Sequence, residues 1–154
     1  MNNFLNFLRS ENLQKEDVDL NNLISGVLQL YNRECAVQGI EVETEFQEPF
    51  VLSVDPERFK TVLLNVVLNA IQAMPDGGKL NITTDGQRKL IRISDTGEGI
   101  PEKNLENIFD LFYTTKSAGT GLGLPTAYKI VKEHGGDISI KSETGKGTVV
   151  EIAL

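Results

Sequence analysis

Glycines and polar residues between Asp95 and Leu124 form the stretch of this chain with the clearest chemical pattern. It reads DTGEGIP, then IFDLFYTTK, then GTGLGL, and it holds five of the chain's 14 glycines. Glycine allows the backbone to take positive φ and to turn its N–H groups toward anionic oxygens. With an Asp at the front and Thr-Thr-Lys in the middle, this spacing suits close wrapping of a phosphorylated ligand.

Two familiar phosphate-binding motifs do not fit this stretch. The chain has no G-x-x-x-x-G-K-[ST] sequence, and its paired glycines do not complete G-x-G-x-x-G after a strand. The P-loop and Rossmann sites are therefore excluded, and a different nucleotide-binding fold is expected.

Each part of the stretch has a chemical and an ordinary interpretation. Asp95 could accept a hydrogen bond from an exocyclic amine such as that of adenine, or it could simply form an Asp-Gly turn. Lys116 could neutralise a γ-phosphate as a point charge, or it could be a solvated loop lysine. The segment from Gly119 to Gly123 could place a phosphate on the N-terminus of a helix opening at Pro125, or it could be a flexible loop.

A second candidate site lies on a predicted helix that runs from Pro56 to about Met74. At 100° per residue, Asn65 and Asn69 fall one turn apart on a narrow polar stripe, opposite an apolar one. An amide oxygen is a hard neutral ligand that suits Mg2+, which also takes waters and phosphate oxygens. The ordinary alternative is a solvated helix face.

The elements that must position these residues follow from periodicity and end signals. Helices are predicted at residues 20–38, 56–74 and 125–134. Strands are predicted at residues 40–46, 50–54, 80–84, 90–94, 138–141 and 148–153, with hairpins joining the last two pairs. This order predicts an α+β fold, a two-layer sandwich of a mostly antiparallel mixed sheet with about three helices packed on one face.

Composition limits the class of protein. With 154 residues, 40% of them hydrophobic, the chain suits one globular domain over residues 13–154, after a remnant of a preceding helix at 1–12. A net charge of −7 without a basic run argues against nucleic acid as a partner. Cys35 as the single cysteine fits a reducing cytoplasm, and no apolar run reaches the roughly 18 residues of a membrane helix. We expect the isolated domain to be monomeric, with no direct membrane contact.

Taken together, NVVLNAIQAM, DTGEGIP, FDLFYTTK and GTGLGL resemble the N, G1, F and G2 boxes of sensor histidine kinases. The ATP-binding catalytic domain of that family belongs with gyrase-type ATPases in the Bergerat fold. The resemblance covers nearly all of the chain from Asp19 onward, and the FYTTK segment and NAIQAMPDGG turn look most like the nitrogen-regulation subgroup. Two departures are visible, Leu111 in place of a common Pro and Pro125 in place of a common Ser. Neither affects a proposed ligand contact.

The resemblance implies ATP and Mg2+ as cofactors. It implies that Asn69 binds the metal, with Asn65 in support, and that Asn65, Asn69 and Lys116 act in catalysis. It also implies a lid from about Pro101 to Gly119. The nucleotide-binding residues that it implies are Asn65, Asn69, Asp95, Gly97, Gly99, Ile100, Lys116, Gly119, Thr120, Gly121, Leu122, Gly123, Leu124 and Thr148.

One position separates phosphotransfer from hydrolysis. Gyrase-type ATPases carry a Glu one turn before the metal-binding Asn, whereas this chain has Asn65, an amide that cannot act as a general base. The γ-phosphate is therefore expected to go to a histidine in another domain of the parent chain or its dimer partner, and then to a response regulator. His134, the single histidine, precedes two glycines and is expected to be structural. Two other classes stay open: an ATPase whose base is Glu98 or Glu102, and a binding module that works without nucleotide.

Overall fold

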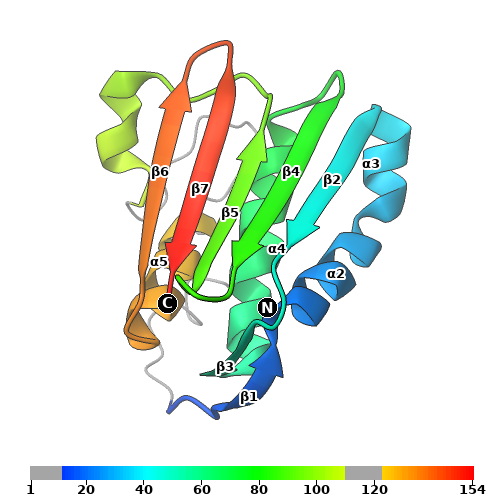
Figure 1. Cartoon of the computed structure of the whole chain (residues 1–154). Coiled ribbons are helices and arrows are strands. Elements are labelled where there is room, and N and C mark those ends of the chain that lie inside the picture. Colours follow the sequence, from blue (N-terminus) through cyan, green and yellow to red (C-terminus); the bar gives the residue numbers. More distant parts are fainter. Residues whose placement is uncertain (1–11, 110–122) are drawn as a thin grey trace.

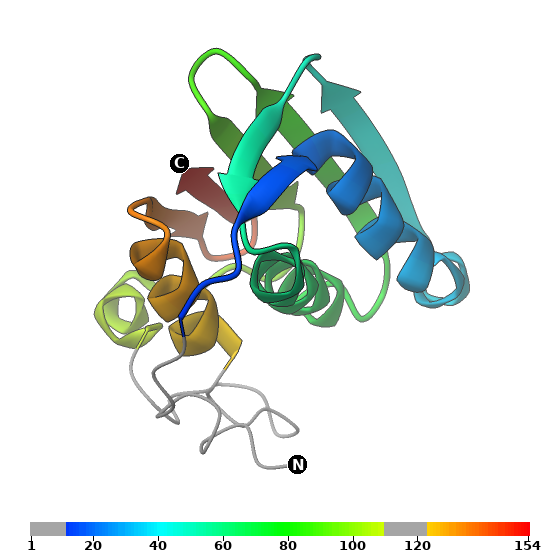
Figure 2. The same cartoon turned by 90° about the horizontal axis from the view of Figure 1, so that it is seen from below.

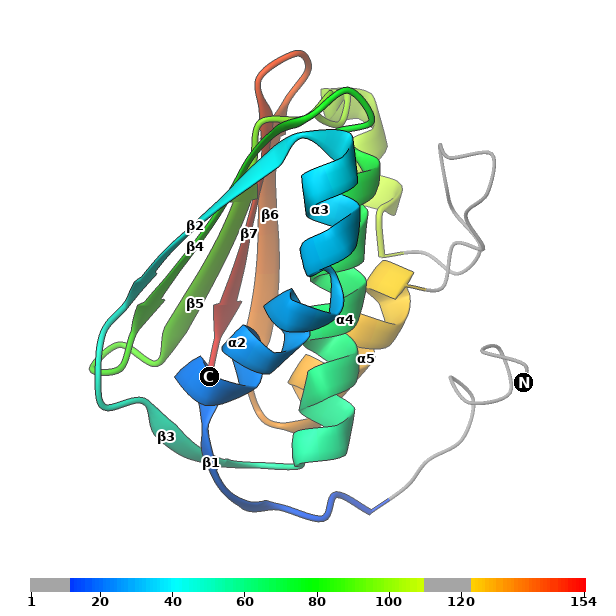
Figure 3. The ribbon, with the colours of Figure 1, turned by 90° about the vertical axis from the view of Figure 1, so that its right-hand side faces the viewer.

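The computed structural model describes residues 12–109 and 123–154. Within these residues, a five-stranded sheet in the order β2–β4–β5–β7–β6 forms one layer, and helices cover one of its faces (Figures 1 and 3). The strands are β2 (Ile40–Phe46), β4 (Gly78–Asp85), β5 (Leu90–Asp95), β6 (Asp137–Glu143) and β7 (Gly147–Ala153). β2 and β4 are parallel, and the other three pairings are antiparallel. The predicted mixed, mostly antiparallel sheet is confirmed.

The helical layer contains α2 (Leu20–Leu30), α3 (Asn32–Gln38), α4 (Pro56–Gln72) and α5 (Gly123–Glu133). A short 3-10 helix, η1 (Glu102–Asn107), lies beside α5 when the molecule is viewed from below (Figure 2). None of the helices in the described part of the chain is long and apolar enough to cross a membrane.

Helix α4 is the central helix of this layer, and its ends are set by local sequence. Asp55 accepts a hydrogen bond from the Arg58 backbone N–H (3.2 Å) and Pro56 takes the first helical position. Its apolar stripe, which includes Phe59 and Leu63, is fully buried against the sheet. The polar stripe therefore faces away from the sheet, as predicted.

The segment predicted as one helix over residues 20–38 is two helices. The chain bends at Tyr31, which has φ −104° and ψ 8° and donates its N–H to the carbonyl oxygens of Leu28 and Gln29. The apolar periodicity stops at the same residue, and Cys35 is the one residue of α3 that is buried. Without an apolar stripe, nothing in the sequence of α3 holds it in line with α2.

Strand β1 (Glu16–Asp19) was not predicted. It pairs antiparallel with β3 (Val51–Val54) in a separate two-stranded sheet, so the predicted strand at residues 50–54 exists but lies outside the main sheet. The acidic sequence EDVD, largely exposed, has neither the β-branched content nor the alternation typical of a strand. Its extended form comes from pairing with β3.

Helix α5 begins at Gly123, two residues before the predicted start at Pro125. Gly123 and Leu124 therefore belong to the first helical turn and not to a loop. Proline is compatible with this because the first-turn N–H groups have no partner within the helix.

Candidate nucleotide-binding site

The candidate site lies along one edge of the sheet, and this edge is formed by the ends of strands and not by an outer strand. It is uppermost in Figure 1, and segments distant in sequence meet there. At this edge β5 ends at Asp95, β6 ends at Glu143 and β7 begins at Gly147. The C-terminus of α4 lies at the same edge, because the residues after β5 bond to it. The site is therefore built on helix and strand ends.

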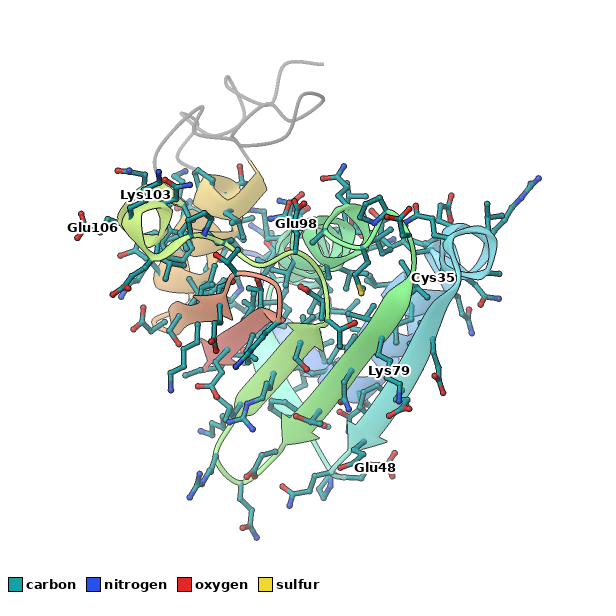
Figure 4. All side chains as sticks on the ribbon, turned by 90° about the horizontal axis from the view of Figure 1, so that it is seen from above. Cys35, Glu48, Lys79, Glu98, Lys103 and Glu106 are labelled. Carbon is teal, nitrogen blue, oxygen red and sulfur yellow. The ribbon has the colours of Figure 1, made fainter. Side chains whose placement is uncertain are left out.

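Four hydrogen bonds hold the loop after β5 in place. Thr96 donates to the carbonyl oxygen of Lys79 (3.2 Å), and Glu98 donates to that of Ala73 at the end of α4 (3.1 Å). The carbonyl oxygen of Glu98 accepts from Gly145 in the β6–β7 turn (2.8 Å), and Asp95 Oδ1 accepts from the backbone N–H two residues on (2.8 Å). Figure 4 shows Glu98 at this edge, with Lys103 and Glu106 on η1. The loop that follows Asp95 is tied to both layers.

The glycines of this loop are required by packing against the protein itself. A Cβ on Gly97 would lie 2.4 Å from the carbonyl oxygen of Ala73. A Cβ on Gly99, which has φ +75°, would lie 2.2 Å from that of Glu143. The sequence analysis related these glycines to the close approach of a ligand, and the structure shows that they also allow the close approach of the ends of α4 and β6.

Asp95 and Thr148 are partners in the β5–β7 register. Each continues the alternation of buried residues on its strand, so both side chains lie on the helix-covered side of the sheet. Thr148 is 9% exposed, and its hydroxyl lies 2.8 Å from that of Ser142 on β6. Ser142 also accepts from the Ile100 backbone N–H (2.7 Å).

Sequence reasoning missed Ser142. One signal was available: in the predicted final hairpin, Ser142 continues the alternation of Ile138 and Ile140, so it lies on the inner face of β6. That alternation alone does not reveal its partners.

The asparagines of α4 lie on the face turned toward α5. Both Asn65 and Asn69 are half-buried, and Asn65 Nδ2 donates to the carbonyl oxygen of Gly123 (3.1 Å). This contact joins the polar stripe of α4 to the first turn of α5. Because the amide nitrogen is occupied by Gly123, the amide oxygen of Asn65 is the atom left to meet a cation or its waters.

The described part of the predicted lid is ordered against α5. Asn104 donates to the carbonyl oxygen of Pro101 (2.8 Å) at the start of η1. The ring of Phe109 packs on that of Tyr128, with centroids 4.9 Å apart. This ring contact ties the last described residue of the segment to α5.

Nine of the predicted ligand-binding residues lie in the described part of the chain, on helices α4 and α5, at the ends of β5 and β7 or in the loop after β5. They are Asn65, Asn69, Asp95, Gly97, Gly99, Ile100, Gly123, Leu124 and Thr148. The other five, Lys116, Gly119, Thr120, Gly121 and Leu122, lie outside the described residues. In residues 12–109 and 123–154, no three His, Cys, Asp or Glu side chains lie together as a metal site.

His134 lies at the opposite end of α4. Its Nε2 accepts from the Asp55 backbone N–H (3.0 Å) and its Nδ1 lies 2.8 Å from the carbonyl oxygen of Ile130. Since the carbonyl only accepts, the proton is on Nδ1 and the ring is neutral in this arrangement. The ring packs edge-on against Phe59, with centroids 5.9 Å apart. Both nitrogens are used in joining α5 to the start of α4.

Known proteins resemble this chain in sequence and in the arrangement of their helices and strands. Residues 54–154 match the family described as histidine kinase-, DNA gyrase B-, and HSP90-like ATPase. Sporulation kinase C of Bacillus subtilis (strain 168) is 37% identical over 139 residues, covering 88% of this chain and 32% of the kinase. Sensor histidine kinase ZraS of Escherichia coli (strain K12) is 37% identical over 153 residues, covering 97% of this chain and 33% of the kinase. The chain thus spans about a third of the length of these relatives.

Solved structures agree. The nucleotide-free catalytic domain of histidine kinase ThkA superposes with a TM-score of 0.83 at 36% identity, covering 92% of this chain and 95% of that domain. ThkA solved in complex with the response regulator protein TrrA gives a TM-score of 0.83 at 32% identity, covering 98% of this chain and 44% of that one. The sandwich expected from the Bergerat-fold resemblance is therefore confirmed. This chain belongs to the histidine kinase-, DNA gyrase B- and HSP90-like ATPase family, as a histidine kinase catalytic domain.

Proposed function

We propose that this domain binds ATP with Mg2+ and supplies the γ-phosphate to a histidine on a separate dimerisation domain in two-component signalling. The observation that carries the proposal is the convergence of three parts: the asparagine face of α4, the tied loop after Asp95, and the first turn of α5. Each part offers a different kind of contact to a ligand. Because the chain belongs to a family of ATPases, a nucleotide is the ligand that we expect these three parts to bind.

The residues present suit the two cofactors. Ionised Asp95 presents acceptor oxygens, which match the amino group of adenine. Asn65 and Asn69 offer neutral oxygens one helical turn apart, a donor type that Mg2+ takes alongside waters and phosphate oxygens. Lys116, beyond the described residues, would add a positive charge at the γ-phosphate. When bound, Mg2+ would supply charge neutralisation during transfer.

Phosphotransfer fits this site better than hydrolysis. Asn65 occupies the place of a general base but carries no proton-accepting group at neutral pH, and its amide nitrogen is bonded to Gly123. A histidine acceptor is itself a nucleophile, so positioning and charge neutralisation suffice. His134 is unsuitable as that acceptor because both of its ring nitrogens are bonded within the fold.

The partners follow from this chemistry. A phosphoacceptor histidine domain, from the parent chain or its dimer partner, would receive the phosphate, and a response regulator receiver domain would take it next. The likeness to ThkA, which was solved with a response regulator, supports the second partner. We place the parent protein near the nitrogen-regulation subgroup on its FYTTK and NAIQAMPDGG sequences, and in the cytoplasm. The isolated domain is proposed to be monomeric and to make no contact with nucleic acid or membrane.

Calorimetry with ATP and Mg2+ tests the metal role of Asn69. The variant Asn69→Ala is expected to bind Mg-ATP about 10-fold more weakly, equivalent to about 1.4 kcal/mol. The matched control is Gln72→Ala, because Gln72 is an exposed residue on the same polar stripe of the same helix. With EDTA in place of Mg2+, Asn69→Ala and the wild type should bind ATP equally. Unchanged Mg-ATP binding in Asn69→Ala would remove the proposed metal ligand.

A second experiment tests the transfer. This domain, mixed with an upstream helical domain that bears the acceptor histidine, should label that domain from γ-labelled ATP. The same mixture with Asn69→Ala should label it more slowly. Rapid release of inorganic phosphate with no labelled protein would favour an ATPase instead.

A further inference from the structure

The hydroxyl of Ser142 has three polar neighbours. It lies 2.7 Å from the backbone nitrogen of Ile100, 3.0 Å from the carbonyl oxygen of Gly147 and 2.8 Å from the hydroxyl oxygen of Thr148. Ser142 is half-buried on the inner face of β6, and Thr148 is buried beside it on β7. This contact therefore joins the loop after β5, strand β6 and strand β7.

Counting protons fixes the direction of all three hydrogen bonds. The Ile100 N–H can only donate, so Ser142 accepts from it. The Gly147 carbonyl can only accept, so the single proton of Ser142 is directed to it. All three bonds form together only if the proton of Thr148 is donated to Ser142.

This direction sets the character of Thr148. With its proton directed to Ser142, the Thr148 hydroxyl has only lone pairs to offer any other group. Thr148 is the register partner of Asp95, and the two side chains lie on the same side of the sheet. An ionised Asp95 is also an acceptor, so both of these side chains present acceptors at this corner of the site.

We propose that Ser142 is a specificity-determining positioning residue, which holds Thr148 as a hydrogen-bond acceptor and so favours a nucleobase with an amino group at that corner. The inference rests on the proposed function, because it assumes that a nucleotide base lies against Asp95 and Thr148. Adenine carries an amino group where hypoxanthine and guanine carry a carbonyl oxygen. Against two acceptors, the amino group can donate a hydrogen bond directly. The carbonyl oxygen cannot, and it would need an intervening water that donates to both oxygens.

The variant Ser142→Ala would free the proton of Thr148. Thr148 could then turn its hydroxyl to donate to a carbonyl oxygen, so the site would discriminate less between the two kinds of base. One hydrogen bond of ordinary strength corresponds to about a 3- to 10-fold change in a binding ratio. Loss of the Ile100 contact should also loosen the loop, but that change weakens both kinds of nucleotide alike.

The test compares binding of ADP and inosine diphosphate by calorimetry, each with Mg2+. The wild type is expected to prefer ADP, and Ser142→Ala is expected to lower that preference about 3- to 10-fold. Ser142→Thr keeps the hydroxyl and should restore the preference. Ser139→Ala serves as the matched control, because Ser139 lies on the same strand with its side chain exposed on the opposite face.

A double-variant cycle shows whether the effect passes through Thr148. Thr148→Val keeps the size of the side chain and removes its hydroxyl, so it should lower the preference by itself. Adding Ser142→Ala to Thr148→Val should then change the ratio no further. The Thr148→Val variant also provides a test if Ser142→Ala fails to fold. An unchanged preference for ADP over inosine diphosphate in Thr148→Val would by itself overturn the inference.

Two kinds of failure are distinguishable. Wild-type protein that binds neither nucleotide would overturn the proposed function, and this inference with it. Wild-type protein that prefers ADP, with the same preference in Ser142→Ala, would overturn the role of Ser142 and leave the proposed function standing.

Discussion

The side-chain amide of Asn65, in the middle of α4, donates a hydrogen bond to the carbonyl oxygen of Gly123 across 3.1 Å and 58 residues of sequence. The contact joins the helix that carries both asparagines to the first turn of α5. It also orients the amide, since a carbonyl partner requires nitrogen on that side and leaves the oxygen for the ligand side. The side chain of Asn65 thereby holds α5 against α4 and presents its oxygen to the candidate site.

The variant Asn65→Asp is expected to break this contact. A carboxylate has no proton to donate, so one of its oxygens would face the Gly123 carbonyl oxygen in a half-buried position. We expect a loss of about 1–3 kcal/mol of unfolding free energy in urea denaturation, with weaker ATP binding. The control Gln72→Glu adds the same charge at an exposed position of α4 and should change stability by about 0.5 kcal/mol or less. Equal stability of Asn65→Asp and Gln72→Glu would contradict the structural role of Asn65.

The variant Gly99→Ala is expected to disturb the loop after β5 by two separate effects. Its φ of +75° is unfavourable for alanine, and the new Cβ would lie 2.2 Å from the carbonyl oxygen of Glu143. Gly39→Ala isolates the first effect, because Gly39 has φ +77° and no heavy atom lies within 4 Å of the position that its Cβ would take. The control Gly39→Ala should lose about 1–2 kcal/mol of unfolding free energy, and Gly99→Ala should lose at least about 1 kcal/mol more. Thermal and urea unfolding measure the difference, and equal losses would show that the clash is relieved.

Acid should weaken the start of α4 through Asp55. Burial by itself raises the pKa of the Asp55 carboxyl, but backbone N–H donors of Gln14, Arg58 and Glu57, with the Arg58 charge, lower the pKa below its ordinary value. A lowered folded-state pKa means that the carboxylate stabilises the fold at neutral pH, and that this stability is lost as pH falls below about 4.

The variant Asp55→Asn measures this contribution. It keeps one capping oxygen for Arg58 but places an amide nitrogen where the other oxygen accepts from Gln14 (2.9 Å). We expect Asp55→Asn to be about 1 kcal/mol less stable than the wild type at pH 7. Urea denaturation should be measured from about pH 2 to about pH 7, which covers the ordinary pKa range of carboxyl groups. The difference in unfolding free energy between the variant and the wild type should shrink below about pH 4. A difference that stays constant over that range would contradict the assignment.

His134 is expected to remain unlabelled when the domain is incubated with γ-labelled ATP. Its Nε2 accepts from Asp55 and its Nδ1 donates to Ile130, so neither nitrogen can attack a phosphate without opening the end of α5. His134→Ala should instead cost about 1–3 kcal/mol of stability, because it leaves the Asp55 N–H without this partner. ATP binding should be unchanged, since His134 lies at the far end of α4 from Asn69. Stable label on His134, located by mass spectrometry, would contradict this structural role.

Several features were predictable because they depend on neighbours in sequence. The cap at Asp55 with Pro56 after it, the apolar stripe of α4, and the placement of Asn65 and Asn69 on the opposite stripe all follow from helical periodicity. The β4–β5 and β6–β7 hairpins followed from alternation and turn residues. In these cases the interactions that choose the structure lie within a few residues of one another.

The amino-acid sequence alone thus predicted the sandwich and the family, and it suggested most of the residues of the candidate site, because periodicity and motif spacing are local properties. Tertiary structure alone decided that EDVD becomes a strand, that Gly99 is needed against Glu143, and that Ser142 lies against Thr148. Each of these depends on a partner brought close by folding, and a hydrogen bond or a steric contact has no energy until its two partners meet. The order of residues along the chain does not show which of them will meet. The direction of the hydrogen bonds at Ser142 and Thr148 could therefore be worked out only from the three-dimensional structure.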